Sequence, residues 1–195
     1  MKRRLLAGTC LLLGLFILSD GIYMKAKARL AQYLLERAWQ ETLSGGREIR
    51  PWGWADTWPL ARLSFPSLDQ SHIVLAGANG RTMAFGPGHL SASALPGKRG
   101  HSYVSAHRNS QFRDLQYLSI GDEIIVERPD GTAVTYIIDD TSIFNAEENY
   151  LALTFDEDRL SLITCYPFET LQSGTPWRYM VSAYMKRKPR LQKDI

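Results

Sequence analysis

Cysteine is scarce in this chain, with only Cys10 and Cys165 among 195 residues. Cys10 falls inside an N-terminal apolar run, so we expect no structural disulfide between the two. Glycine and proline, at 15 and 9 residues, are too few for a disordered or collagen-like chain, and no internal repeat or low-complexity block is present. With 45% hydrophobic residues, the chain suits one globular domain with a terminal appendage.

Basic residues are in short supply in the middle of the chain, although the formal net charge is +3. Residues 30–185 contain 12 basic and 18 acidic residues, because the other basic residues cluster near the two ends. A surface that binds phosphate groups is therefore not expected on this body, and we expect no nucleic-acid partner.

The N-terminal segment has the pattern of a membrane anchor. Residues Leu5–Ser19 carry no charge, and the apolar run continues to Met24 with Asp20 as its interruption. About 20 apolar residues in a helix span a bilayer core, and the basic cluster before the run favours a cytoplasmic N-terminus. A cleaved signal peptide is the alternative, but basic residues at 25, 27 and 29 are a poor setting for a cleavage site. In either case the body is expected outside the cytoplasm.

Four segments follow from this pattern and from the residues after it. Residues 1–24 are expected to form a cytoplasmic tip and a retained transmembrane anchor, and residues 25–49 an amphipathic stalk helix with a linker. Apolar residues recur at helical spacing over Ala26–Leu43, and Gly45-Gly46 then ends the helix. Residues 50–185 form the folded body, and residues 186–195 a basic tail.

The body reads as a series of short strands. Residues 51–66 contain three Trp and three Pro and predict an extended segment. Arg128–Thr132 has the composition of a hairpin turn, and Gln111–Leu118 has a helical stripe. The expected strands are Ile73–Ala76, Arg81–Phe85, His101–His107, Glu123–Glu127, Ala133–Ile138, Leu160–Cys165 and Trp177–Tyr184. Such short strands between turns predict an all-β domain that is closed or nearly closed.

Cys165 is the residue that most suggests chemistry. It ends an apolar run and is followed by Tyr166-Pro167, so we expect it at a strand end on the rim of the domain. A free cysteine is commonly just a small buried apolar residue. To act as a nucleophile it must ionise, and its ordinary pKa of about 8.5 leaves little thiolate at neutral pH. A reactive Cys165 therefore requires a histidine and a positive charge nearby.

His107 and Arg178 are the candidates for these two groups. His107 closes its expected strand, whereas His72 and His89 lie beside turn-like residues and His101 begins the strand. Arg178 begins the last expected strand, and the forked donors of a guanidinium suit a developing oxyanion. Position makes His107 the favourite among the histidines. Spacing alone does not distinguish Arg178 from an ordinary surface arginine.

Several motifs in order carry a more specific signal: Ala106–Leu115, Gly121-Asp122, Leu162–Cys165 and Trp177-Arg178-Tyr179. As a set they resemble the sortases, a family of membrane-anchored cysteine transpeptidases. The stretches Pro51–Pro59, Gly86–Leu90 and Thr164–Phe168 are similar to the subgroup found in Gram-negative bacteria. The likeness extends from about residue 50 to residue 185. It departs at Ala106, where sortases commonly have glycine before the histidine.

The resemblance implies an eight-stranded sortase-type β-barrel with short helices, preceded by the anchor helix. It implies His107, Cys165 and Arg178 as the catalytic set, whereas Thr164 is either a residue of the substrate site or an ordinary strand residue. The implied reaction cleaves a C-terminal sorting signal of the Leu-Pro-x-Thr-Gly type on an exported protein and transfers it to an amine acceptor. No cofactor or metal is implied, and the chain would sit in the inner membrane with its catalytic domain in the periplasm.

Other interpretations stay open at this point. An L,D-transpeptidase also uses a cysteine, but the Ser-x-Gly-Cys surroundings are absent. A non-catalytic β-module on a membrane stalk would leave Cys165 buried and slow to alkylate. A zinc site built from His101, His107 and Cys165 lacks a fourth ligand. The acidic clusters Glu147-Glu148 and Asp156–Asp158 fit a solvated face better than a calcium site.

Overall fold

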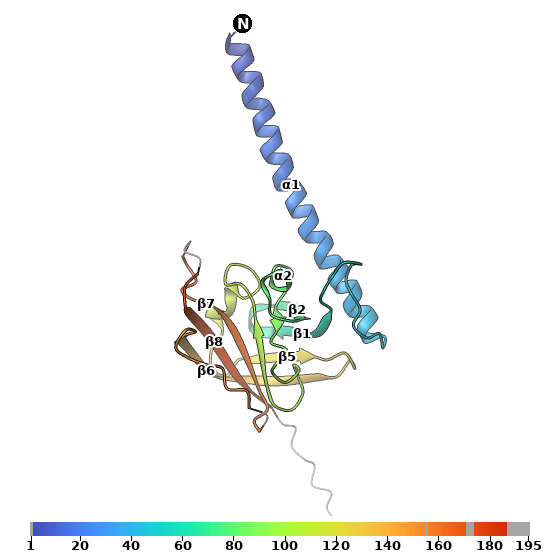
Figure 1. Cartoon of the computed structure of the whole chain (residues 1–195), viewed down its shortest axis with the longest axis vertical. Helices are drawn as coiled ribbons and strands as arrows, with labels where there is room; N and C mark the ends of the chain where they lie inside the picture. The colour runs from blue at the N-terminus through green and yellow to red at the C-terminus, as the bar shows by residue number, and fades with distance from the viewer. Residues whose placement is uncertain (1, 155, 171–173, 187–195) are drawn as a thin grey trace, which may run out of the picture.

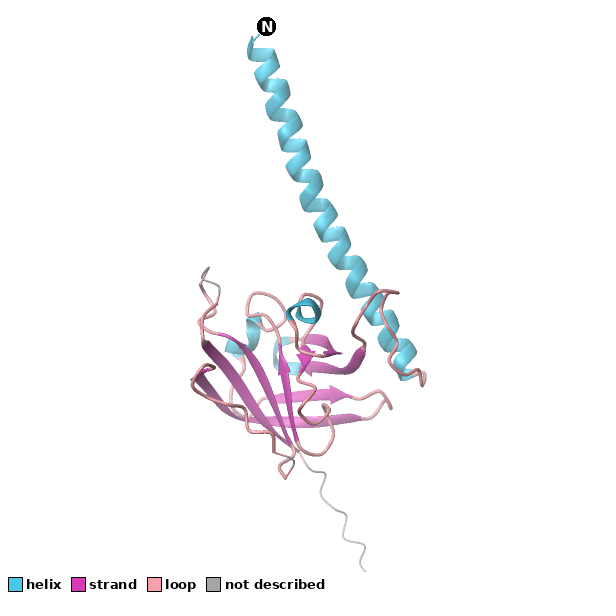
Figure 2. Ribbon diagram, viewed as in Figure 1, coloured by secondary structure: helices cyan, strands magenta, loops and turns pink. Residues whose placement is uncertain are grey.

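A computed structural model shows a closed β-barrel with one long helix that projects from its side (Figure 1). The structure describes residues 2–154, 156–170 and 174–186, and in the long helix it omits the side chains of residues 4–12, 15–18 and 20. Figure 2 shows the strands gathered in one body, with short helical pieces at its edge. Of the basic tail expected over residues 186–195, only residue 186 lies among the described residues.

The described residues form eight strands. They pair in the order β1-β2-β3-β4-β7-β8-β6-β5, and β5 closes the barrel against β1. The pairs are antiparallel except β2 with β3 and β4 with β7, which run parallel. The strands are β1 (Pro59–Phe65), β2 (Gln70–Ala76), β3 (Gly88–His89), β4 (His101–Ser105), β5 (Glu123–Glu127), β6 (Ala133–Asn145), β7 (Arg159–Cys165) and β8 (Trp177–Met185). The eight-stranded all-β barrel expected from the sequence is confirmed.

Apolar side chains that alternate along the strands fill the barrel. In β1 every second residue is buried, and Leu63 and Phe65 are among the largest fully buried side chains. Phe112 and Leu115, from the segment after β4, pack into the same core. Because strand residues alternate between two faces, the residues between these core positions point to the outside of the barrel. The candidate site described below lies on that outer side.

The helix expected over Ala26–Leu43 is the last part of a longer helix, α1 (Lys2–Leu43). Leu35 and Trp39 of this part are buried, and Glu36 pairs with Arg62 of β1 at 2.6 Å. In the described portion of the chain, no helix has the length and hydropathy needed to cross a membrane. Most side chains of the apolar run that ends at Met24 lie outside the described residues, so the anchor stays a prediction.

Three elements expected from the sequence differ in the structure. The strand expected over Arg81–Phe85 is instead a helical turn, α2 (Gly80–Met83), because the side chain of Asn79 accepts a hydrogen bond from the backbone of Thr82 and caps the turn. The helical stripe over Gln111–Leu118 is a shorter 3₁₀ helix, Arg113–Tyr117. The strand expected to end at His107 ends two residues earlier.

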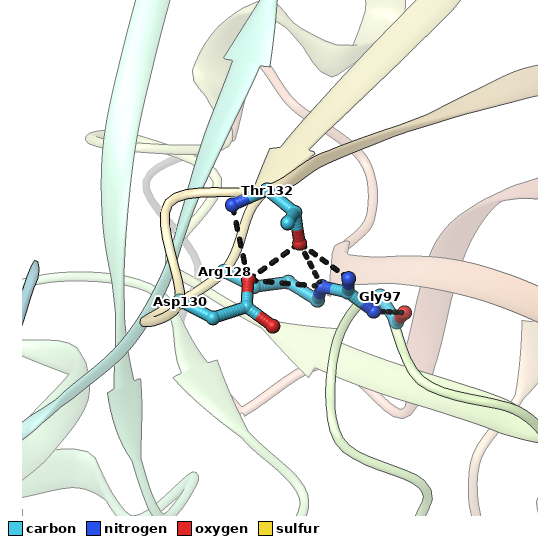
Figure 3. A network of polar contacts seen from close by, with 4 residues as sticks. All are labelled: Gly97, Arg128, Asp130 and Thr132. Atoms are coloured by element: carbon cyan, nitrogen blue, oxygen red, sulfur yellow. Dashed lines mark hydrogen bonds and ion pairs between the residues drawn. The ribbon is translucent and has the colours of Figure 1, made fainter.

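The turn between β5 and β6 ties the far end of the barrel together (Figure 3). The guanidinium of Arg128 donates to the carbonyl of Gly97 at 3.2 Å and to the hydroxyl of Thr132. Gly97 has a φ of 77°, and an added Cβ there would lie 2.9 Å from the Arg128 side chain, so glycine is required. Hydrogen bonds from Thr132 lower the pKa of the Asp130 carboxyl. By strand register, this end of β6 is opposite the end that meets Arg178.

Candidate active site

Two predicted site residues are cross-strand neighbours. Cys165 is the last residue of β7, and Arg178, near the start of β8, is its partner in the antiparallel register. Directly opposed residues in a sheet project to the same face. The thiol of Cys165 and the guanidinium of Arg178 therefore lie on one face at one edge of the barrel.

The third predicted residue reaches this edge from β4. Ser105 of β4 is the register partner of Ile163 of β7. Beyond the strand, the backbone N–H of Ala106 still donates to the Ile163 carbonyl at 3.2 Å. Continuing this register puts His107 next to Cys165. The structure thus brings the ends of β4, β7 and β8 together; Cys165 and Arg178 lie on two of these strands, and His107 lies two residues beyond the end of the third.

The side chain of Thr164 holds the approach to His107 in place. Thr164 is 1% exposed, and its hydroxyl donates to the carbonyl of Ala106 at 2.8 Å. It points into the barrel, away from the thiol of Cys165, which is partly exposed. The contact fits the interpretation of Thr164 as a strand residue that ties β4 to β7. Ala106 is itself buried, so a side chain larger than methyl has little room there.

Arg178 is anchored by one of its nitrogens and leaves the others for a ligand. Its Nη1 donates to the carbonyl oxygens of Thr175 at 2.5 Å and Trp177 at 2.9 Å. Its Nε and Nη2 make no hydrogen bond within the described part of the chain. A guanidinium has five N–H donors and stays protonated, so Arg178 can still present a forked pair of donors to an anion.

A groove of about 310 Å³ lies on the outer face of the barrel, and Arg178 is one of its lining residues. Its lining comes from β4, β7 and β8, from the end of β6 and the segment after it, and from two loops on the other side. The lining residues are Ala78, Leu90, Tyr103, Val104, Ser105, Phe144, Ala146, Asn149, Leu151, Ile163 and Arg178. Because most of these are apolar, the groove suits an extended peptide that carries an aliphatic side chain.

The remaining histidines have other roles. His89 is buried and bonds to the Ala94 carbonyl at 2.9 Å, and burial lowers its pKa. Burial also lowers the pKa of His101, and the nearby Arg159 lowers it further. No group of three or more His, Cys, Asp or Glu side chains that could hold a metal occurs among the residues that the structure covers.

Sequence reasoning missed most of the groove. Tyr103, Ser105 and His107 are alternate residues of one segment, so their side chains are expected on the same face. This alternation could have indicated which β4 residues face the thiol of Cys165. Phe144 lies outside any strand expected from the sequence, because β6 extends to Asn145 rather than ending at Ile138, and Leu151 lies in the segment that follows β6. No pattern in the sequence indicates that this segment borders Arg178.

Comparison with known proteins gives one consistent result. A family model described as the sortase domain matches residues 63–186. Sortase D of Bacillus subtilis (strain 168) is 29% identical over 126 residues, which are 64% of this chain and 62% of that protein. The chain therefore matches less than two thirds of that relative's length.

Solved structures share the fold. Sortase C-1 from Actinomyces oris is 28% identical, with a TM-score of 0.58 over 67% of this chain and 74% of that one. Sortase A from Corynebacterium diphtheriae, at 24% identity, has a TM-score of 0.60 over 82% of this chain and 86% of that one.

Proposed function

The chain belongs to the sortase family, and from this premise we propose that it is a cysteine transpeptidase that acts through Cys165, His107 and Arg178. The observation that supports the proposal is the strand register: it pairs Cys165 of β7 with Arg178 of β8, and its continuation past the end of β4 leads His107 toward the same edge. Arg178 also lines an apolar groove. The partly exposed thiol also disfavours a non-catalytic module with a sealed cysteine.

The first half of the reaction makes a thioester. The Cys165 thiolate attacks the carbonyl carbon of the scissile peptide bond, and a C–S bond forms as the carbonyl π electrons move to oxygen. The free donors of Arg178 stabilise that oxyanion. When the tetrahedral intermediate collapses, the C–N bond breaks and the His107 imidazolium gives its proton to the departing amine.

The second half transfers the acyl group. Neutral His107 takes a proton from the incoming amine, whose nitrogen attacks the thioester carbonyl and expels the Cys165 thiolate. Water in place of the amine gives a carboxylic acid by the same route. The residues thus return to their starting protonation states after each turnover.

The substrate is an exported protein with a C-terminal sorting signal of the Leu-Pro-x-Thr-Gly type, cleaved between Thr and Gly. The apolar groove supports this choice, because its lining suits the aliphatic side chain of the leading Leu of such a signal. The chain is a sortase of the Gram-negative subgroup, a proposal supported by the stretches Pro51–Pro59 and Thr164–Phe168. It is anchored in the inner membrane by residues 1–24 with its barrel in the periplasm, which the apolar run and its basic flank support.

The test follows a labelled sorting peptide with the full chain in detergent. The wild-type protein should cleave the peptide and carry a covalent acyl adduct on Cys165, which mass spectrometry of the digested protein locates. Cys165→Ala should lose both the cleavage and the adduct, whereas the matched variant Cys10→Ala should keep both. Cleavage that persists in Cys165→Ala would refute the assignment of the nucleophile.

A further inference from the structure

One wall of the groove comes from the residues between β6 and β7, and those that the structure describes, 146–154 and 156–158, form no helix or strand. Ala146, Asn149 and Leu151 of this wall line the groove. Its first residue is fixed because the Ala146 N–H donates to the carbonyl of Pro176 at 2.9 Å. Its last turn is fixed because the Asp158 carboxylate accepts from the N–H of Gly100 at 3.0 Å.

The middle of this wall is held from the barrel by Tyr103. The Tyr103 hydroxyl donates to the carbonyl of Ala152 at 2.9 Å, and Ala152 follows the groove residue Leu151. The backbone N–H of His101 adds a bond to the carbonyl of Thr154 at 3.0 Å. The Tyr103 side chain is 4% exposed and also lines the groove, so one residue contributes to both the floor and the fixing of the wall.

A chain of hydrogen bonds continues from that hydroxyl into the barrel wall. Because Tyr103 gives its proton to Ala152, its oxygen is left to accept from Nδ1 of His101 at 3.2 Å. The Nε2 atom of His101 then accepts from the Ser161 hydroxyl at 2.8 Å, which lies 3.0 Å from the Ser182 hydroxyl. The rings of Tyr103 and His101 stack at 4.2 Å. Rotating the Tyr103 hydroxyl away from Ala152 would break this sequence of donors and acceptors.

Burial keeps both rings in the required protonation states. Burial raises the pKa of Tyr103, so its hydroxyl keeps the proton that it donates. Burial and the charge of Arg159 lower the pKa of His101, which favours the neutral ring with one nitrogen free to accept.

We propose that Tyr103 is a positioning residue that sets substrate specificity, because its hydroxyl holds the wall at Ala152 and so fixes Leu151 against the groove. Leu151 faces an apolar lining that includes Leu90, Phe144 and Ile163. A wall at this place contacts an aliphatic side chain of the bound peptide rather than the reacting carbonyl. This inference rests on the proposed transpeptidase function.

The experiment compares two sorting peptides that differ only in the leading aliphatic residue, Leu or Ala. Tyr103→Phe keeps the ring and its stacking but removes the hydroxyl. Loss of one neutral hydrogen bond gives about a fivefold effect, so we expect KM for the Leu peptide to rise about fivefold with kcat within roughly twofold. The ratio of kcat/KM between the Leu and Ala peptides should fall by a similar factor.

Tyr150→Phe is the matched control, because it makes the same chemical change within the wall itself, at a residue that is 98% exposed. It should leave both peptides unaffected. A Tyr103→Phe protein with an unchanged peptide ratio, or with equal losses for both peptides, would overturn the inference, since a general structural defect acts on both alike.

Amide hydrogen exchange of the full chain separates this inference from the proposed function. In Tyr103→Phe the amides of residues 151–154 should exchange faster than in wild type, while those of β4 and β7 should not. If the wild type cleaves neither peptide, the proposed function fails, and the exchange result alone decides whether Tyr103 holds the wall. Unchanged exchange there would refute it.

Discussion

Replacing Arg178 with lysine keeps the positive charge but removes the fork. In the structure, Nη1 of Arg178 is occupied by the carbonyls of Thr175 and Trp177, which leaves Nε and Nη2 to meet an oxyanion. A lysine ammonium that takes over the two carbonyls has no second nitrogen to direct at the groove. Loss of one oxyanion donor costs about 2.7–4 kcal/mol, or about 10²–10³ in kcat.

We therefore expect Arg178→Lys to lower kcat at least about 100-fold, with a much smaller change in KM, because the oxyanion exists only in the transition state. Initial rates with a labelled sorting peptide measure both constants. Arg159→Lys is the matched control: Arg159 makes a bidentate ion pair with Asp139, away from the groove, and its replacement should leave kcat within roughly twofold. A drop of only a few-fold in Arg178→Lys would refute the assignment of Arg178 as a forked oxyanion donor.

Two further predictions concern the support of the site and the stability of the barrel. Thr164→Val keeps the shape but leaves the buried carbonyl of Ala106 without its partner, so urea denaturation should show a loss of about 1–3 kcal/mol, and kcat/KM should fall as His107 loses its support. An unchanged kcat/KM would show that this bond does not position His107. Burial lowers the pKa of His72, His89 and His101 below the ordinary value of 6.5. The unfolded chain therefore binds more protons near that pH, and the free energy of unfolding should fall between pH 7.5 and pH 5.5. A flat or rising profile in urea titrations would contradict the buried, neutral state of these rings.

The parts of the fold that local patterns determine were predictable from the sequence. Alternation and β-branched composition located the strands that carry Cys165 and Arg178, and the turn over Arg128–Thr132 is present as expected. The parallel pairing of β4 with β7 was not predictable, because residues 58 apart in sequence form its ladder. The two-residue strand β3 is likewise too short to leave a periodic signal.

The candidate site was also predictable from the sequence only in part. Chain position and family motifs predict His107, Cys165 and Arg178 as the site, but only the register shows that Cys165 and Arg178 are neighbours and that β4 ends beside them. Whether the side chain of Thr164 points into the barrel or toward the site depends on which face of β7 meets the core. The sequence did not decide this, so both interpretations of Thr164 stayed open. The role of Tyr103 depends on a contact with Ala152 across 49 residues, for which no local pattern exists.

The place of β8 in the barrel has a consequence for how the protein matures. β8 is the last strand of the described chain, and it pairs with both β7 and β6. A nascent chain that has emerged only as far as Cys165 has neither the guanidinium of Arg178 nor the strand that joins the two halves of the sheet. Synthesis of β8 therefore supplies both the strand that joins β6 to β7 and the proposed oxyanion donor in a single step, so an unfinished chain carries the thiol of Cys165 without the guanidinium proposed to assist it.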